Sequence, residues 1–234
     1  MRRIGKIVLA FLIVVILLLA GFASWVLFYS HDLPDTAHLG DFAPAVKHQA
    51  MGDCVPDTVT AIPFSEIGKT LAGAVAAAEG GVEGDSLLRA EFKRNSNVPH
   101  RATLSQQIAR TLFCNSSERP LHRQVKELRL AIRLDRQFSR QQLFAIYLNR
   151  VSFGECGVGV QNASQYLFHK DPVGLTSAEA PLLAGMISRP GYYSPGRHPD
   201  RALVRRNEVL DAMVASRQLT PADATQAKNA PLLP

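Results

Sequence analysis

The sequence lacks the residues and motifs on which several large classes of protein depend. Of its 234 residues only 3 are cysteine, so the chain is not a small domain built on a disulfide framework. The metal-binding spacings CxxC and HExxH are absent, and so is the phosphate-binding motif GxxxxGK[ST]. The net charge is +6, and Arg2, Arg3 and Lys6 supply three of those charges before the first acidic residue. The remaining excess of +3 is too small for a dedicated nucleic-acid-binding protein.

One long apolar run lies next to those three basic residues. Residues 7–29 contain no charged residue, and about 20 apolar residues suffice for a helix to cross the hydrocarbon core of a bilayer. The basic residues in front of the run indicate a cytoplasmic N-terminus, whereas Trp25 and Tyr29 suit the lipid–water boundary at its far end. A cleaved signal peptide is the alternative, but the run exceeds the usual apolar core of about 7–15 residues. We therefore predict an uncleaved single-pass anchor with the rest of the chain outside.

Composition divides the chain into three parts. Residues 1–30 form the cytoplasmic N-terminus and the anchor. Residues 31–63 are sprinkled with proline, aspartate and histidine and keep no helical period, so we predict a linker with one short strand at Thr58–Ile62. Residues 64–234 form the outer domain, which we predict to be mainly α-helical.

Helix signals recur throughout the outer domain. A helix is expected from Glu66 to Glu79, where glycines follow. Capping patterns predict three further helix starts, at Thr103–Gln106, Ser139–Gln142 and Thr176–Glu179. Pro120 suits the first turn of another helix. A last helical pair is expected at about 200–215 and 221–228, the second opened by Thr220 and Pro221.

The helix after Pro120 carries a regular apolar stripe. We expect this stripe to be buried and the neighbouring arginines to lie off it. The stripe comprises Leu121, Val125, Leu128 and Ile132.

Three segments in order carry a resemblance to a known family. They are residues 102–113 (ATLSQQIARTLF), residues 123–155 and residues 182–210. Together they resemble the family 51 glycosyltransferases, which are the lipid II polymerases of class A penicillin-binding proteins and the monofunctional peptidoglycan glycosyltransferases. The resemblance covers about residues 64–215. It implies a lysozyme-like, two-lobed helical fold.

The resemblance also implies a reaction, partners and a location. The 4-hydroxyl of an incoming lipid II sugar attacks the anomeric carbon of the growing glycan, and undecaprenyl diphosphate leaves. The implied partners are lipid II, the growing glycan strand, membrane lipids and other cell-wall synthesis proteins, with no nucleic acid. The implied location is the inner membrane, with the catalytic domain in the periplasm. No cofactor is implied, although the sequence leaves a divalent metal open.

The first family motif is the least preserved. It reads Glu-Asp-x-x-Phe-x-x-His-x-Gly in the family, and here only Glu79, after three alanines, is retained. The resemblance implies that Glu79 is the general base, and a solvated helix end is the alternative. Glu83 and Asp85 stay open as replacements.

The second motif supplies candidate substrate-binding residues. Thr103, Gln106 and Gln107 match it, and Arg110 stands where the family has a lysine. The resemblance implies that these residues bind substrate, with Arg110 gripping a phosphate through two donors. A plain helix cap is the alternative for Thr103, and a plain surface residue is the alternative for Arg110.

The third motif, Arg-Lys-x-x-Glu, retains its first and last residues as Arg123 and Glu127. The resemblance implies that Arg123 faces the diphosphate and that Glu127 is a second catalytic carboxylate, which orients substrate or neighbouring cations. Spacing i, i+4 also fits a simple helix ion pair, which is the alternative.

The fourth and fifth motifs are interpreted as structural. Asn149 is expected to tie its helix end to the glycine-rich loop that follows, and Arg206 to Leu210 to support the fold. Leu143, Ile146, Tyr147 and Leu148 are expected in the core.

The three cysteines leave their pairing open. A bridge between Cys54 and Cys114 would tie the linker to the domain, and it is favoured over a bridge between Cys114 and Cys156 or a free thiol.

Two main functions stay open. The first is a peptidoglycan glycosyltransferase, which the retained charged residues favour. The second is a binding or scaffold protein that has lost turnover with its first motif. A lytic enzyme with a lysozyme-like acid pair is weaker, because the arginines would have no purpose there.

Overall fold

The structure is a computed structural model that describes residues 2–28, 33–36, 39–40, 60–79, 103–112 and 120–233. These residues form helices joined by loops and turns, and none of them belongs to a β-strand beyond the isolated bridge between Ser152 and Val158. The strand predicted at Thr58–Ile62 is therefore wrong for its described part, residues 60–62. The mainly helical fold is confirmed.

The helices follow one another along the chain with short connections in the C-terminal half. The α-helices are α1 (Arg2–Phe28), α2 (Phe64–Ile67), α3 (Lys69–Ala78), α4 (Leu104–Leu112), α5 (Pro120–Gln137), α6 (Arg140–Arg150), α7 (Val160–Phe168), α8 (Glu179–Met186), α9 (Pro199–Ala215) and α10 (Pro221–Asn229). Two short 3-10 helices are η1 (Gly154–Cys156) and η2 (Pro172–Gly174).

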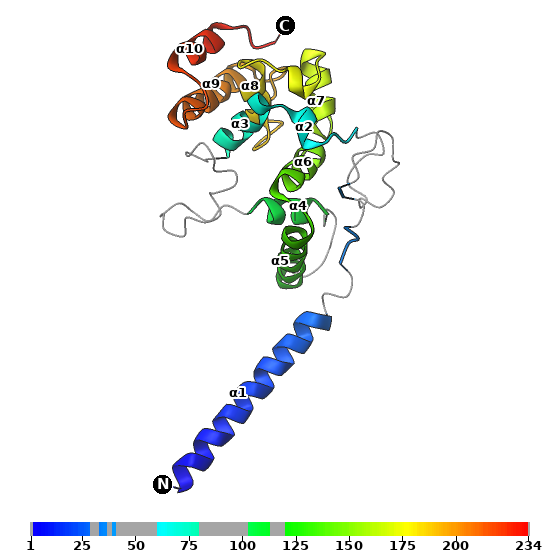
Figure 1. Ribbon diagram of the computed structural model, residues 1–234, viewed down its shortest axis with the longest axis vertical. Helices are drawn as coiled ribbons and strands as arrows, with labels where there is room; N and C mark the ends of the chain where they lie inside the picture. The colour runs from blue at the N-terminus through cyan, green and yellow to red at the C-terminus, as the bar shows by residue number, and fades with distance from the viewer. Residues whose placement is uncertain are drawn as a thin grey trace.

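The helices of the outer domain gather in two groups on either side of α6. Helices α3, α8, α9 and α10 pack on one another at one end, and α4 packs on α5 at the other. Helix α6 lies between the two groups and contacts α4, α5 and α7 (Figure 1). This arrangement is consistent with a lysozyme-like, two-lobed domain.

Local sequence signals place most of the helix starts. Helix α4 opens with reciprocal bonds between Thr103 and Gln106, and α6 opens with the predicted capping box of Ser139 and Gln142. Helix α5 begins at Pro120, as predicted. The helix expected from Glu66 to Glu79 is instead broken at Gly68, whose φ of 81° is open to glycine.

One helix was not predicted. Helix α7 follows a run of glycines and begins after Gly159, which has a φ of 87°. The glycines form the loop that they predict. The helix that follows this loop buries Val160 and Leu167 in the core.

The prediction of the buried face of α5 is wrong. Leu130 and Leu134 are fully buried, whereas Leu128 is 51% and Ile132 is 44% exposed. The helix carries apolar residues on two faces, and the face that packs on α4 is the one that also carries the buried Ala131. The other apolar face is left at the surface.

Helix α1 extends away from the other helices, and α5 is the labelled helix nearest to it (Figure 1). Its end contacts α5 through Trp25 and His122, whose ring centroids are 5.6 Å apart. Apolar side chains from Phe11 to Phe22 are exposed along it. Within the described ranges, no helix reaches the combination of length and apolar character that crossing a membrane requires. The anchor therefore stays a prediction.

The two residues interpreted as structural do hold the fold. Arg206 is fully buried on α9 and donates to the carbonyls of Lys228, Ala230 and Pro231 at 2.8–3.2 Å, so it ties the C-terminal segment to α9. Asn149 has a different partner from the one expected. Instead of the following loop it binds the backbone of Ile62, accepting at 3.1 Å and donating at 2.8 Å.

Candidate active site

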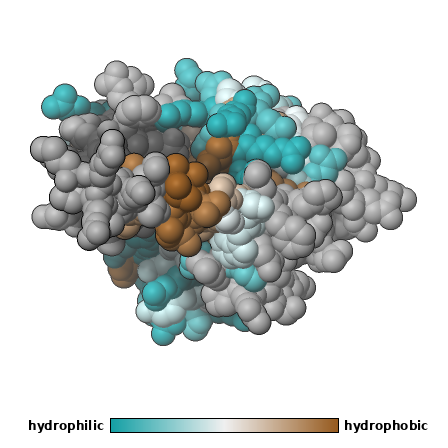
Figure 2. Space-filling model, turned by 90° about the horizontal axis from the view of Figure 1, so that it is seen from below, coloured by the Kyte–Doolittle hydropathy of each residue, from teal (hydrophilic) through white to brown (hydrophobic). Residues whose placement is uncertain are grey.

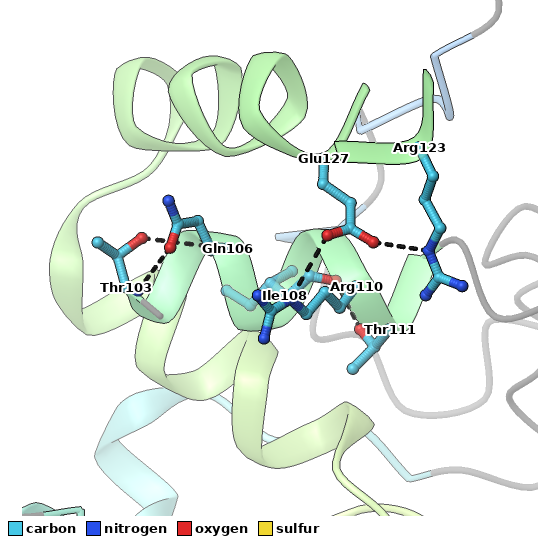
Figure 3. A network of polar contacts seen from close by, with 7 residues as sticks. All are labelled: Thr103, Gln106, Ile108, Arg110, Thr111, Arg123 and Glu127. Carbon is cyan, nitrogen blue, oxygen red and sulfur yellow. Dashed lines mark hydrogen bonds and ion pairs between the residues drawn. The ribbon is translucent and has the colours of Figure 1, made fainter. Parts of the chain in front are cut away.

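A carboxylate held between two guanidinium groups marks the contact of α4 with α5. Glu127 Oε1 accepts from Arg123 Nε at 2.7 Å, one helical turn earlier on α5. Glu127 Oε2 accepts from Arg110 Nε at 3.4 Å, across the helix contact from α4. Figure 3 shows the Glu127 carboxylate with one arginine on each side. The structure thus brings together three of the predicted site residues.

The burial of the three side chains differs in a way that suits anion binding. The Glu127 side chain is only 13% exposed, whereas those of Arg110 and Arg123 are 58% and 36% exposed. The carboxylate is therefore the inner member of the cluster, and each guanidinium keeps a surface in contact with solvent. Arginines of this kind can bind a phosphate oxygen while the carboxylate fixes their position.

The packing of α4 on α5 fixes the cluster. Ile108 and Ala109 of α4 and Leu130 of α5 are fully buried in this contact region. Ser105 of α4 donates a hydrogen bond to Asp135 of α5. Apolar packing and this hydrogen bond hold α4 against α5. The Arg110 side chain is therefore close enough to Glu127 to donate to it.

Thr103 and Gln106 do not join the cluster. The Thr103 N–H donates to Gln106 Oε1 at 3.0 Å, and the Gln106 N–H donates to Thr103 Oγ1 at 3.2 Å. These bonds form the helix cap that was the alternative for Thr103. They lie at the opposite end of α4 from Arg110 (Figure 3), about 10 Å away at 1.5 Å per residue. Gln107, which follows Gln106 on α4, is half-buried.

Glu79 lies at the C-terminal end of α3, where its N–H donates to the Val75 carbonyl at 3.0 Å. It is half-buried. Its charge acts on Tyr147 of α6, whose pKa is raised above its ordinary value, first by burial and second by Glu79. The Glu79 charge is therefore within electrostatic range of the buried Tyr147 phenol. Glu83 and Asp85 lie outside the described residues.

Helix α6 lies between the helix group that carries Glu79 and the pair of helices, α4 and α5, that holds Glu127 (Figure 1). Arg150 follows Tyr147 by three residues, so both side chains share a face of α6. Arg150 Nε donates to Thr111 Oγ1 of α4 at 3.3 Å, and burial lowers the pKa of its guanidinium to about 10. One face of α6 therefore carries Tyr147, whose pKa responds to the charge of Glu79, and Arg150, which donates to α4, the helix that carries Arg110.

Sequence reasoning missed Arg205, which supports the Glu79 position. Its Nη2 donates to the Ala78 carbonyl at 3.3 Å, directly before Glu79. Its guanidinium also lies 5.8 Å from the Tyr193 ring centroid and 2.9 Å from Glu208. A Cβ on Gly185 would come within 2.8 Å of Arg205 Cγ, so glycine makes room for this side chain. In the sequence, the position of Arg205 directly before Arg206 was the only indication that it has a role.

Cys54 and Cys114, the two cysteines of the predicted disulfide, lie outside the described residues. Cys156 is a buried free thiol, and burial with the nearby charge of Glu155 raises its pKa to about 11. Among the residues that the structure describes, no three histidine, cysteine, aspartate or glutamate side chains gather as a metal site.

Comparisons with known proteins give the class of the chain. A family model described as Transglycosylase matches residues 50–214. The chain is 31% identical to penicillin-binding protein 1A of Aquifex aeolicus, over 97% of its own length and 34% of the relative's. It is 31% identical to penicillin-binding protein 1A of Vibrio cholerae, over 100% of the chain and 30% of the relative. It is 30% identical to penicillin-binding protein 1F of Bacillus subtilis, over 87% and 31%.

The chain therefore belongs to the transglycosylase family, and the predicted family is confirmed. It spans about a third of the length of these curated relatives.

Proposed function

We propose that the chain is a membrane-anchored peptidoglycan glycosyltransferase that polymerises lipid II and releases undecaprenyl diphosphate. The observation that carries the proposal is the Glu127 carboxylate held between Arg110 and Arg123 at 3.4 and 2.7 Å. Family membership and the penicillin-binding proteins among the relatives support the substrate class.

The two arginines bind the diphosphate of the glycan donor. When the bond between the anomeric carbon and the diphosphate oxygen breaks, negative charge develops on the leaving group. Cations already fixed beside that oxygen stabilise the charge without rearranging. Glu127 keeps both guanidiniums in position, since each of its oxygens accepts from one of them. The guanidiniums supply the positive charge themselves, so we propose no metal requirement.

Glu79 takes the proton. The 4-hydroxyl oxygen of the incoming sugar forms the new bond to the anomeric carbon while the bond to the diphosphate breaks, and the hydroxyl proton moves to the Glu79 carboxylate. Arg205 and Tyr193 hold the end of α3 that carries Glu79, through the Ala78 carbonyl. Division of the work between two carboxylates in different surroundings is common in such reactions.

Helix α1 anchors the enzyme in the inner membrane, with the N-terminus in the cytoplasm and the other helices in the periplasm. The exposed apolar side chains from Phe11 to Phe22 support this orientation together with Arg2, Arg3 and Lys6 in front of them. The anchor keeps the site near the bilayer, where the lipid tail of the substrate stays.

A lipid II-binding scaffold without turnover is the second candidate. It is favoured by one observation, the loss after Glu79 of the Asp, Phe and His that the family's first motif carries. The arginine cluster would still hold a diphosphate in such a protein.

Incubation of the purified full chain with labelled lipid II decides between the two candidates. The glycosyltransferase produces polymer, also in the presence of EDTA, and Glu79→Gln abolishes it. Glu66→Gln, which removes the same charge at an exposed position on α2, is the matched control and leaves the polymer unchanged. A folded chain that binds lipid II and forms no polymer under any condition would make the scaffold the function.

A further inference from the structure

The surface of α5 that sequence reasoning expected to be buried forms one wall of an open groove. The opposite wall comes from the segment that follows α1. Leu33, Arg129, Ile132, Arg133, Arg136 and Gln137 line the groove. Leu128, one turn before Ile132, extends the apolar part of this surface. The groove is therefore both apolar and rich in arginine.

The groove is separate from the candidate active site. Glu127 and Arg136 are nine residues apart on α5, which places them about 180° apart around the helix axis. Arg129 is turned about 160° from Glu127 by the same geometry. The diphosphate bound by Arg123 thus lies on one side of α5, and the groove lies on the other.

The charge of the groove is positive. Arg133 and Arg136 are exposed on the α5 wall, and Asp135 between them is turned toward α4, where it accepts from Ser105. Asp35 follows Leu33 by two residues and is exposed. Guanidinium groups bind phosphate oxygens in pairs of hydrogen bonds, so the groove suits a phosphate next to apolar groups.

The position of the groove relative to α1 points to the source of that phosphate. Leu33 follows the end of α1 at Phe28 by five residues, which can span at most about 18 Å. Thr36 Oγ1 donates to Gln137 Oε1 at 2.6 Å, which fixes the following segment on α5. Seen from below, along the direction in which α1 extends, exposed apolar residues (brown) lie beside hydrophilic ones (teal) (Figure 2). If α1 enters a bilayer, the groove lies within reach of its outer headgroups.

We propose that the α5 groove binds the headgroup phosphate of an anionic phospholipid of the bilayer that α1 enters. Arg129, Arg133 and Arg136 contact the phosphate, and Leu128 with Ile132 lies against the boundary of the acyl chains, as in helices that lie in the membrane interface. The inference rests on the proposed function only for the anchor, and it does not require turnover. The bound lipid fixes the rotation of the domain about α1.

Photocrosslinking of the full chain in nanodiscs tests this contact. The nanodiscs contain phosphatidylcholine and a small fraction of phosphatidylglycerol with a photoreactive headgroup, and crosslinked peptides are mapped by mass spectrometry. We expect crosslinks in residues 129–137 that unlabelled phosphatidylglycerol competes away and inorganic phosphate does not. The double variant Arg133→Gln/Arg136→Gln should lower the labelling on the order of tenfold. The charge-matched control Lys69→Gln/Arg217→Gln changes exposed residues elsewhere and should keep it.

The outcomes separate the lipid site from the anchor. If the double variant co-purifies with nanodiscs and is labelled as strongly as the control, the lipid site in the α5 groove is overturned. The proposed anchor is then unaffected. Equal labelling by a phosphatidylcholine probe removes the headgroup specificity, and competition by inorganic phosphate makes the groove a general anion site, so either result also overturns the proposal. Failure of the chain to enter nanodiscs at all would remove the proposed anchor, and the lipid site with it, while lipid II polymerisation in detergent would remain measurable.

Discussion

The two candidate catalytic carboxylates lie in different surroundings. Glu127 is enclosed by helix packing, and both of its oxygens accept from arginines. Glu79 lies at the end of a helix, its charge raises the pKa of the buried Tyr147, and the preceding residue, Ala78, is held by Arg205 from α9. A carboxylate whose oxygens both accept from arginines is suited to positioning, whereas a half-buried carboxylate at a helix end is suited to accepting a proton. The comparison predicts that equal substitutions at the two positions have different consequences.

The largest effect is expected at the position of the base. Glu79→Gln removes the proton acceptor with little change in shape, and loss of a general base lowers the rate by about 10²–10⁴-fold. Initial rates of lipid II polymerisation measure the loss, with Glu66→Gln as the control. Retention of more than about a tenth of the wild-type rate would assign the proton transfer to another group.

A smaller loss is expected at Glu127. Glu127→Gln leaves Arg110 and Arg123 facing each other without the charge between them, so both turn away from the diphosphate. We expect polymerisation to fall by about 10²-fold, which is typical for the loss of an aligned electrostatic contact. Arg123→Lys keeps the positive charge but loses the forked guanidinium group. In the same assay it should keep less than half of the wild-type activity. Wild-type rates in Glu127→Gln would reduce the cluster to a surface ion pair.

The two faces of α5 should differ in their contribution to stability. Leu130→Ala opens a cavity in the contact with α4 and should lower the free energy of unfolding by about 2–5 kcal/mol. Leu128→Ala, at 51% exposure, should change it by less than about 0.5 kcal/mol. Thermal or denaturant unfolding of the two variants measures the difference. Equal losses of stability in the two variants would show that Leu128 is buried in the core and that this face of α5 does not form a surface groove.

The smallest change in rate is expected at Arg205, which acts on Glu79 through the backbone. Arg205→Gln removes the bond to Ala78 and the contact with Tyr193, and we expect kcat to fall about tenfold while KM stays near its wild-type value. Arg205→Lys, which can still donate to the carbonyl, should restore part of kcat. A rise in KM with unchanged kcat would show that Arg205 binds substrate instead of positioning Glu79.

The sequence predicts the features that depend on nearby residues. The caps at Thr103 and Ser139 and the pair of Arg123 with Glu127 form within one helical turn, so spacing alone finds them. The choice between the two apolar faces of α5 was predicted wrongly, because it depends on which face α4 covers. Arg205 and Ala78 are 127 residues apart, and no local pattern joins them.

The family resemblance supplied what spacing could not. Arg110 and Glu127 are 17 residues apart on different helices, and only the order of the motifs placed both in one site. The partner of Asn149 escaped both kinds of reasoning, since Ile62 lies 87 residues away in a segment without a motif.

Separate measurements of lipid II binding and of turnover decide whether Glu79 and the arginine cluster have the roles proposed for them. The affinity of the full chain for labelled lipid II and the rate of polymerisation are measured for Glu79→Gln and Arg123→Gln side by side. We expect Glu79→Gln to bind lipid II within about twofold of wild type and to lose turnover, and Arg123→Gln to lose about tenfold in affinity as well, since about 1.4 kcal/mol of a charged phosphate contact is removed. If Glu79→Gln lost affinity as strongly as Arg123→Gln, or kept its turnover, the assignment of proton transfer to Glu79 and of the diphosphate to the arginine cluster would be contradicted.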